Sequence, residues 1–140
     1  EIASGGELSR IMLAIKSILA DEEGIETLIF DEIDTGISGR TAQKVSERLA
    51  CIAKKRQVIA ITHLPQIAAI ADAHYLIEKT SDSNSTISNI YLLTEEESIK
   101  ELARMLGGVR ITDAVLQNAR EMRTLAKQVC LKQQYACHTK

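Results

Sequence analysis

The stretch that decides the fold is TLIFDEID, residues 27–34, in which an apolar run ends abruptly in acidic residues. A short continuous apolar run is typical of a parallel strand that is buried on both faces. Of the acids that follow, Asp31 and Glu32 are adjacent, so one carboxylate can bind a metal ion while the other faces a water molecule. The simpler interpretation is an acidic cluster that favours the dipole of the next helix.

A second apolar run, VIAIT, covers residues 58–62 and is followed by His63. Apolar residues at three- and four-residue steps predict helices over 7–21 and 41–55, on either side of the first run. Strands that alternate with helices predict an α/β fold with parallel strands at its centre. Ligands bind beyond the carboxyl ends of such strands, so we expect His63 at the same edge as the two acids. A lone histidine at a strand end is nevertheless more often structural than catalytic.

The remaining elements are predicted by local signals. Pro65 suits the first position of a short helix. Strands over 74–79 and 86–93, joined by a polar turn, predict a hairpin. Thr94 and Glu97 form a capping box for a helix that stops at Gly107 and Gly108, and a long final helix is predicted over 112–134.

The chain opens with EIASGGELSR, in which Ser4 and Glu7 predict a capping box. Capping does not explain Gly5 and Gly6, because each glycine costs about 1 kcal/mol relative to alanine inside a helix. Glycines in a first turn leave backbone N–H groups bare at the positive end of the helix, where anions bind. The motif therefore suggests a phosphate contact.

Length and composition limit the class of protein. The chain has 140 residues, of which 45% are apolar and 26% charged, so one soluble domain is predicted. No segment is long and apolar enough to cross a membrane, and three cysteines without metal-ligand spacing favour a reducing compartment, so we expect a cytoplasmic protein. The net charge of −2 hides a basic end, where residues 100–140 hold eight Lys or Arg against three Asp or Glu. Four of these lie on neighbouring parts of the final helix and are either a phosphate contact or a solvated face: Arg120, Arg123, Lys127 and Lys132.

Three motifs in order, ASGGELSR, FDEIDTGISG and ITHLPQIAAIAD, resemble the carboxyl half of an ABC-type ATPase head. They correspond to the signature motif, the Walker B strand with its D-loop, and the switch histidine. Ala3 and Glu7 differ from the Leu and Gln common in transporters, which favours the SMC-like branch and within it the bacterial DNA-repair proteins. The resemblance implies a mostly parallel sheet flanked by helices, with a hairpin and a long final helix, in which residues 1–140 form the C-terminal lobe of a head.

The resemblance also implies a role for each motif residue. Asp31 would bind the Mg²⁺ of MgATP, and Glu32 would orient or deprotonate the attacking water. His63 would contact the γ-phosphate, and Asp34 would reach across a dimer interface. Two heads would share ATP between them. Three residues at the start of the chain would contact the γ-phosphate of the ATP bound to the opposite head: Ser4, Gly5 and Gly6.

The family further implies DNA, a second copy of the head and recombination proteins as partners, no membrane, and a place near the nucleoid. No G-x-x-x-x-G-K-[ST] loop occurs in the chain, so we expect it alone neither to bind ATP tightly nor to hydrolyse it. Two alternatives stay open. One is the non-catalytic head of another SMC-like protein, which only dimerises or holds DNA, and the other is a fragment of a DExD-box helicase, because DEID fits that box literally.

Overall fold

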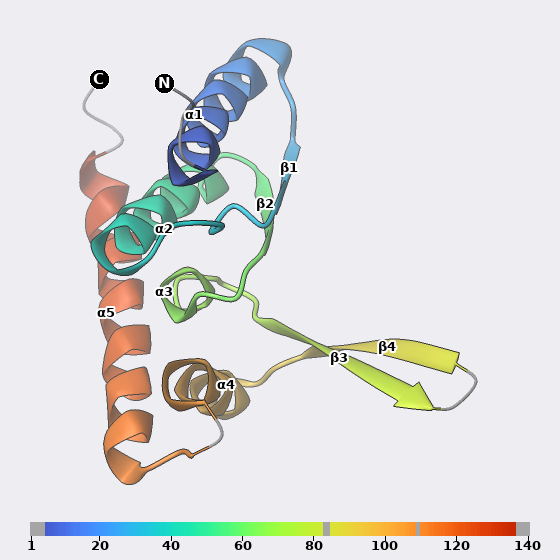
Figure 1. Cartoon of the computed structure of the whole chain (residues 1–140). Helices are drawn as coiled ribbons and strands as arrows, with labels where there is room; N and C mark the ends of the chain where they lie inside the picture. The colour runs from blue at the N-terminus through green and yellow to red at the C-terminus, as the bar shows by residue number, and fades with distance from the viewer. Residues whose placement is uncertain (1–4, 83–84, 109, 137–140) are drawn as a thin grey trace.

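The computed structural model describes residues 5–82, 85–108 and 110–136 (Figure 1). Every predicted helix and strand is present, with bounds that differ from the expected ones by a few residues. The elements in chain order are α1 (Gly5–Glu23), β1 (Thr27–Asp31), α2 (Gly39–Ala53), β2 (Gln57–Ile61), α3 (Pro65–Ala68), β3 (Tyr75–Asp82), β4 (Ser85–Leu92), α4 (Glu95–Gly107) and α5 (Asp113–Ala136).

The expected parallel pairing is confirmed. Strands β1 and β2 are parallel, with Thr27 opposite Gln57 and Asp31 opposite Ile61. Within the described part of the chain this sheet has two strands, and β3 and β4 form a separate antiparallel hairpin. Figure 1 shows the hairpin projecting away from the helices, so the parallel pair alone presents strand ends to the candidate site.

One face of the parallel pair is covered and the other is open. Leu28 and Phe30 are buried in a cluster with Leu13 of α1 and Leu49 of α2. Figure 1 shows both helices on the same side of the strands. The prediction that the first strand is buried on both faces is therefore wrong for this chain. Three isoleucines point from the uncovered face and are exposed by 57%, 44% and 46%: Ile29, Ile59 and Ile61.

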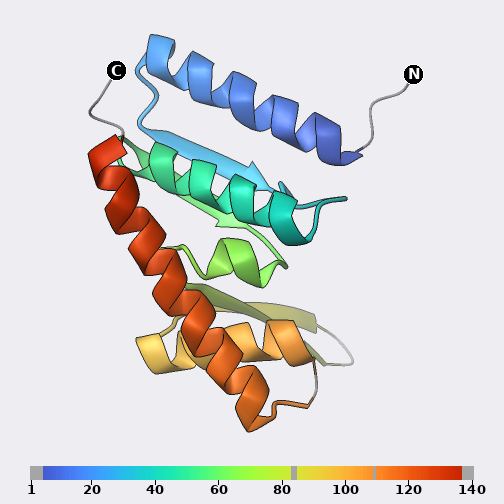
Figure 2. The same ribbon diagram turned by 90° about the vertical axis from the view of Figure 1, so that its left-hand side faces the viewer.

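Helices α3, α4 and α5 enclose a second core. Leu102, Ala103 and Ala119 are fully buried there, and Figure 2 shows α5 running across α3 and α4. The predicted capping box is confirmed, because Thr94 N–H donates to Glu97 at 2.8 Å and the Thr94 hydroxyl accepts from Glu97 N–H. These contacts fix where α4 begins and hence how it meets α5.

Over the residues that the structure describes, the helices fall short of the length and apolarity that a membrane span requires.

Candidate functional site

The carboxyl ends of β1 and β2 carry the acidic and histidine residues predicted for the site. Asp31 is the last residue of β1 and pairs with Ile61, the last residue of β2. Glu32 and His63 follow within two residues of these ends. The expectation that they share one edge of the sheet is therefore confirmed. The first turn of α2 holds no acidic residue, so an acidic partner of its dipole would have to lie before the helix, and the alternative role of these acids stays open.

Glu32 has an unusual backbone conformation. Its φ is +51°, in the left-handed region, and its carbonyl accepts a hydrogen bond from Thr35 N–H at 3.1 Å. Residues other than glycine rarely adopt this conformation, which costs roughly 1–3 kcal/mol. Such strain concentrates at functional sites, where the surrounding structure holds the residue in place. The sharp turn leaves Glu32 exposed at the end of the strand, as a residue that meets water and substrate must be.

Asp34 is the centre of a hydrogen-bond network. Its side chain is 1% exposed, and its Oδ2 atom accepts from the Thr62 hydroxyl, from His63 N–H at 2.8 Å and from Leu64 N–H at 3.2 Å. Its other oxygen, Oδ1, is buried and has no hydrogen-bond partner among the described residues. The loop after β1 is thus bonded to the loop after β2 through one carboxylate.

His63 combines this anchoring with an open position. Its Nδ1 lies 3.1 Å from Asp34 Oδ2, while 71% of its side chain is exposed. This ion-pair contact with Asp34 lies within the chain, and a contact of Asp34 with a second head stays a prediction. Sequence reasoning did not assign Thr62 a role, although a polar residue that directly precedes His63 at the end of an apolar strand was a usable signal.

The fit of Mg²⁺ depends on Asp31. Mg²⁺ is usually bound by one or two carboxylates together with waters and substrate phosphates. Asp31 is an exposed carboxylate at the strand end and suits that role. Among the described residues no group of three or more His, Cys, Asp or Glu is arranged to hold a metal ion. Asp31 as a ligand of Mg²⁺ stays a prediction, in which phosphate oxygens and waters would supply the other ligands.

The phosphate motif at the start of the chain is described in part. Ser4 lies outside the described residues. Helix α1 begins at Gly5, so Gly5 and Gly6 do occupy its first turn. Because α1 runs antiparallel to β1, this turn lies at the same end of the molecule as the carboxyl end of β1 (Figure 2). An anion contact by these residues stays a prediction.

The basic face of the final helix is paired within the chain. Arg120 bonds Glu96 at 3.1 Å, and Lys127 bonds Glu95 at 2.7 Å. Arg123 is 5% exposed and bonds both Glu95 and backbone carbonyls. The side chain of Lys132 lies outside the described residues. Since the other three cations are neutralised by α4, the structure favours a structural role for them over a phosphate contact.

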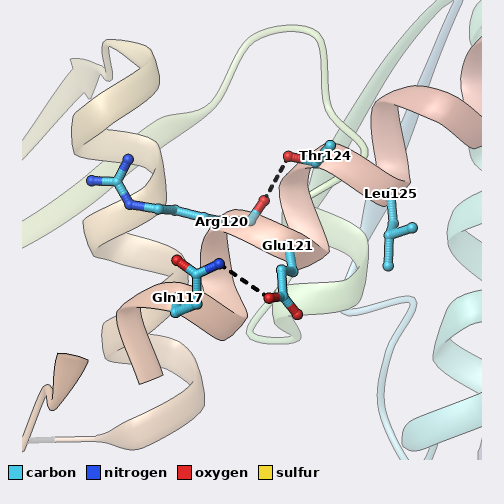
Figure 3. A pocket seen from close by; sticks show the side chains of 5 residues that line it. All are labelled: Gln117, Arg120, Glu121, Thr124 and Leu125. Carbon is cyan, nitrogen blue, oxygen red and sulfur yellow. Dashed lines mark hydrogen bonds between the residues drawn. The ribbon is translucent and has the colours of Figure 1, made fainter. Parts of the chain in front are cut away.

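A shallow hollow of about 390 Å³ lies along the exposed side of α5 (Figure 3). Its lining comes from this helix alone, and Figure 3 shows Gln117 bonded to Glu121 and Thr124 bonded to the carbonyl of Arg120. The hollow is separate from the strand ends and holds none of the residues predicted there, and Arg120 in its lining is paired with Glu96. We assign it no part in the chemistry.

Comparison with known proteins agrees with the resemblance in the motifs. The chain is 45% identical over 129 residues to the DNA repair protein RecN of Bacillus subtilis, 47% identical over 122 residues to that of Haemophilus influenzae and 51% identical over 122 residues to that of Rickettsia conorii. These matches cover 87–92% of this chain. Its sequence relatives are RecN proteins. The chain spans about 22% of the length of these RecN relatives, and no protein-family model matches it.

The fold is similar to that of a solved SMC ATPase. A solved structure from work on ATP-driven dimerization and DNA-stimulated activation of SMC ATPases superimposes with a TM-score of 0.60. The two chains are 23% identical, and the match covers 77% of this chain and 65% of the other. Both the predicted α/β class and the resemblance to RecN and SMC proteins are therefore confirmed.

Proposed function

We propose that this chain is the carboxyl-terminal lobe of an SMC-like ATPase head that acts in DNA double-strand break repair and recombination. Two heads would bind ATP and Mg²⁺ between them and hydrolyse the ATP. The observation that carries this proposal is the shared position of Asp31, Glu32 and His63 at the carboxyl edge of a parallel strand pair. The identity to RecN over nine-tenths of the chain supports the assignment to DNA repair.

In this proposal the residues divide the work of phosphoryl transfer to water. Glu32 orients the attacking water and accepts its proton, and His63 hydrogen-bonds the γ-phosphate. Ser4, Gly5 and Gly6 hold the γ-phosphate of the nucleotide on the opposite head, through N–H groups at the start of α1. Asp34 lies at the interface between heads. Positioning and charge neutralisation supply most of the catalysis in reactions of this type.

Asp31 would hold the Mg²⁺, which when bound neutralises charge on the phosphates. The glycine-rich loop and lysine that cradle the phosphates in such ATPases do not occur in this chain, and would come from another part of the head. We therefore expect the 140-residue chain alone to be inactive, with weak ATP binding at most.

The open apolar face of β1 and β2 supports the assignment of the chain as one lobe. Ile29, Ile59 and Ile61 are all exposed by more than 40%, whereas parallel strands are usually covered on both faces. Burying them would gain about 25 cal/mol for each Å² removed from water. We assign this face to contact with the remaining part of the head, since the chain spans about 22% of its RecN relatives.

The partners and location follow the same proposal. They are DNA, a second copy of the head and recombination proteins, in a bacterial cytoplasm near the nucleoid. The neutralised face of α5 makes that helix a poor candidate for the DNA contact, so DNA would bind elsewhere on the assembled protein.

The decisive experiment is Glu32→Gln in the complete head. ATP binding should persist while the hydrolysis rate falls by roughly a hundredfold or more, because the amide cannot take the proton from water. The unhydrolysed nucleotide should hold the heads together as a long-lived dimer, measured by light scattering after gel filtration.

The matched control is Glu26→Gln, which removes the same charge just before the opposite end of β1. It should leave both hydrolysis and dimer lifetime unchanged. A Glu32→Gln head that hydrolyses ATP at the normal rate, or stays monomeric with saturating ATP, would contradict the proposed function.

A further inference from the structure

Asp34 holds three consecutive residues after β2 through a single oxygen. The Thr62 hydroxyl and the N–H groups of His63 and Leu64 all donate to Oδ2. The Leu64 N–H also lies 3.0 Å from the Thr62 hydroxyl oxygen, so it is shared between two acceptors. The backbone that carries His63 is therefore fixed by a buried carboxylate from another loop.

The same oxygen also lies beside one nitrogen of the His63 ring. The negative charge of the carboxylate is 3.1 Å from Nδ1 and attracts this nitrogen when it carries a proton. The other ring nitrogen, Nε2, then points away from Asp34 on a side chain that is 71% exposed. A partner at one ring nitrogen determines the tautomer and hence what the other nitrogen can do.

We propose that Asp34 is a positioning residue for His63, which holds the ring in its Nδ1–H form and presents Nε2 to the substrate. The identity of that substrate as the γ-phosphate of ATP rests on the proposed function. Fixing the ring in advance avoids the cost of ordering it when the phosphate arrives. Asp34 thereby acts within its own head, in addition to any contact with a second one.

The simpler explanation is that Asp34 only caps the start of α3. Leu64 is the N-cap of that helix, and its own side chain makes no capping bond. Capping accounts for the bond from Leu64 N–H, and anchoring of the loop before α3 accounts for the bonds from Thr62 and from His63 N–H. Neither accounts for the ring contact, so the state of the ring separates the two explanations.

Nuclear magnetic resonance of the whole 140-residue chain can test this without nucleotide. The chain has three histidines, and long-range ¹H–¹⁵N correlations of ¹⁵N-histidine distinguish the two tautomers. At pH 8, His63 should be mainly in the Nδ1–H form. Asp34→Ala should shift the ratio of tautomers toward Nε2–H by about tenfold, because it removes the negative charge beside Nδ1.

Three further variants make the result specific, and a fourth identifies the signal of His63. Asp34→Asn keeps one acceptor oxygen and should retain most of the Nδ1–H form. Thr62→Val removes a donor to Asp34 but not the ring contact, and should leave the tautomer unchanged. Asp72→Ala removes an exposed carboxylate elsewhere and should have no effect. His63→Gln assigns the signal.

An Nε2–H ring in the unaltered chain would overturn the proposal, whether or not Asp34→Ala folds. An unchanged tautomer in a folded Asp34→Ala chain would overturn it as well. In the complete head, Asp34→Ala should lower kcat about tenfold with little change in KM for ATP. If His63→Ala leaves hydrolysis intact, the proposed function of His63 fails, while the tautomer result still decides the role of Asp34.

Discussion

Two buried charged side chains, Asp34 and Arg123, join distant parts of this molecule in opposite ways. Asp34 is 1% exposed and accepts hydrogen bonds from residues that precede α3. Arg123 is 5% exposed and donates from one nitrogen to the carbonyls of Ala69 and Ala71, both at 2.7 Å, directly after α3. The short helix α3 is thus held at its start by an acid and at its end by a base.

The two differ in how completely their charges are compensated. Arg123 also pairs with Glu95, whose carboxylate binds Lys127 as well. Asp34 has one buried oxygen without a partner among the described residues, and its ionic contact is an exposed histidine. A buried polar group that lacks a partner costs free energy, so its persistence points to function rather than stability. We infer that Arg123 maintains the fold and that Asp34 serves the site.

The largest expected effect comes from Arg123→Met, which keeps much of the side-chain volume but removes the donors. One buried and one partly buried carbonyl lose bonds to a charged group, each worth roughly 1.5–3 kcal/mol, so the free energy of unfolding should fall by about 3 kcal/mol. Urea denaturation followed by circular dichroism measures this.

The matched control is Arg120→Met, one turn earlier on α5. Arg120 is 45% exposed and its partner Glu96 is 64% exposed, so this pair should contribute about 1 kcal/mol or less. If the two variants lose the same stability, Arg123 is no more structural than a surface residue and the contrast with Asp34 does not hold.

Local patterns predicted the elements well, whereas contacts between loops were out of reach. Apolar periodicity located the helices, and the parallel pairing followed from the two apolar runs. The left-handed conformation of Glu32 could not be predicted, because glutamate rarely adopts it and the position carries no glycine or asparagine to indicate it. The bond between Asp34 and His63 joins residues 29 positions apart through tertiary packing. Helical spacing also placed Arg123 in one group with exposed cations. Spacing within α5 could not show that Arg123 is buried, because the acids that pair with these cations lie on α4.

A second prediction tests whether Arg123 stabilises the fold because its charge is paired with that of Glu95. Glu95 is half exposed, and its pKa is lowered by hydrogen bonds from Lys127 and Arg123. Glu95→Gln should destabilise the chain at pH 7 by about 1 kcal/mol, after allowance for solvent screening. A lowered carboxyl pKa stabilises the fold at pH values above the pKa that the group has in the unfolded chain. The difference in stability between Glu95→Gln and the unaltered chain should therefore vanish as the pH falls through the pKa of Glu95 in the folded chain.

The control for this prediction is Glu96→Gln, which removes the same charge from the same first turn of α4. Its partner Arg120 is exposed, so the loss should be smaller than that of Glu95→Gln at every pH. Equal losses would mean that the burial of Arg123 adds nothing to the pair.

The smallest expected effect concerns His74, the residue just before the hairpin, whose pKa is affected by the charge of Arg123. Its Nδ1 lies 2.8 Å from the Ser98 hydroxyl oxygen, and its pKa is lowered by burial and by the charge of Arg123, against the opposing effect of Glu101. The unfolded chain therefore binds more protons than the folded chain below pH 6.5, and stability should fall as the pH drops from there. His74→Gln should weaken this loss, measured as the difference in urea midpoint between pH 7.5 and pH 5.5. Arg123→Met should weaken this loss of stability less than His74→Gln does, since burial is the larger cause of the lowered pKa. An unchanged pH profile in both variants would mean that Arg123 affects only the end of α3.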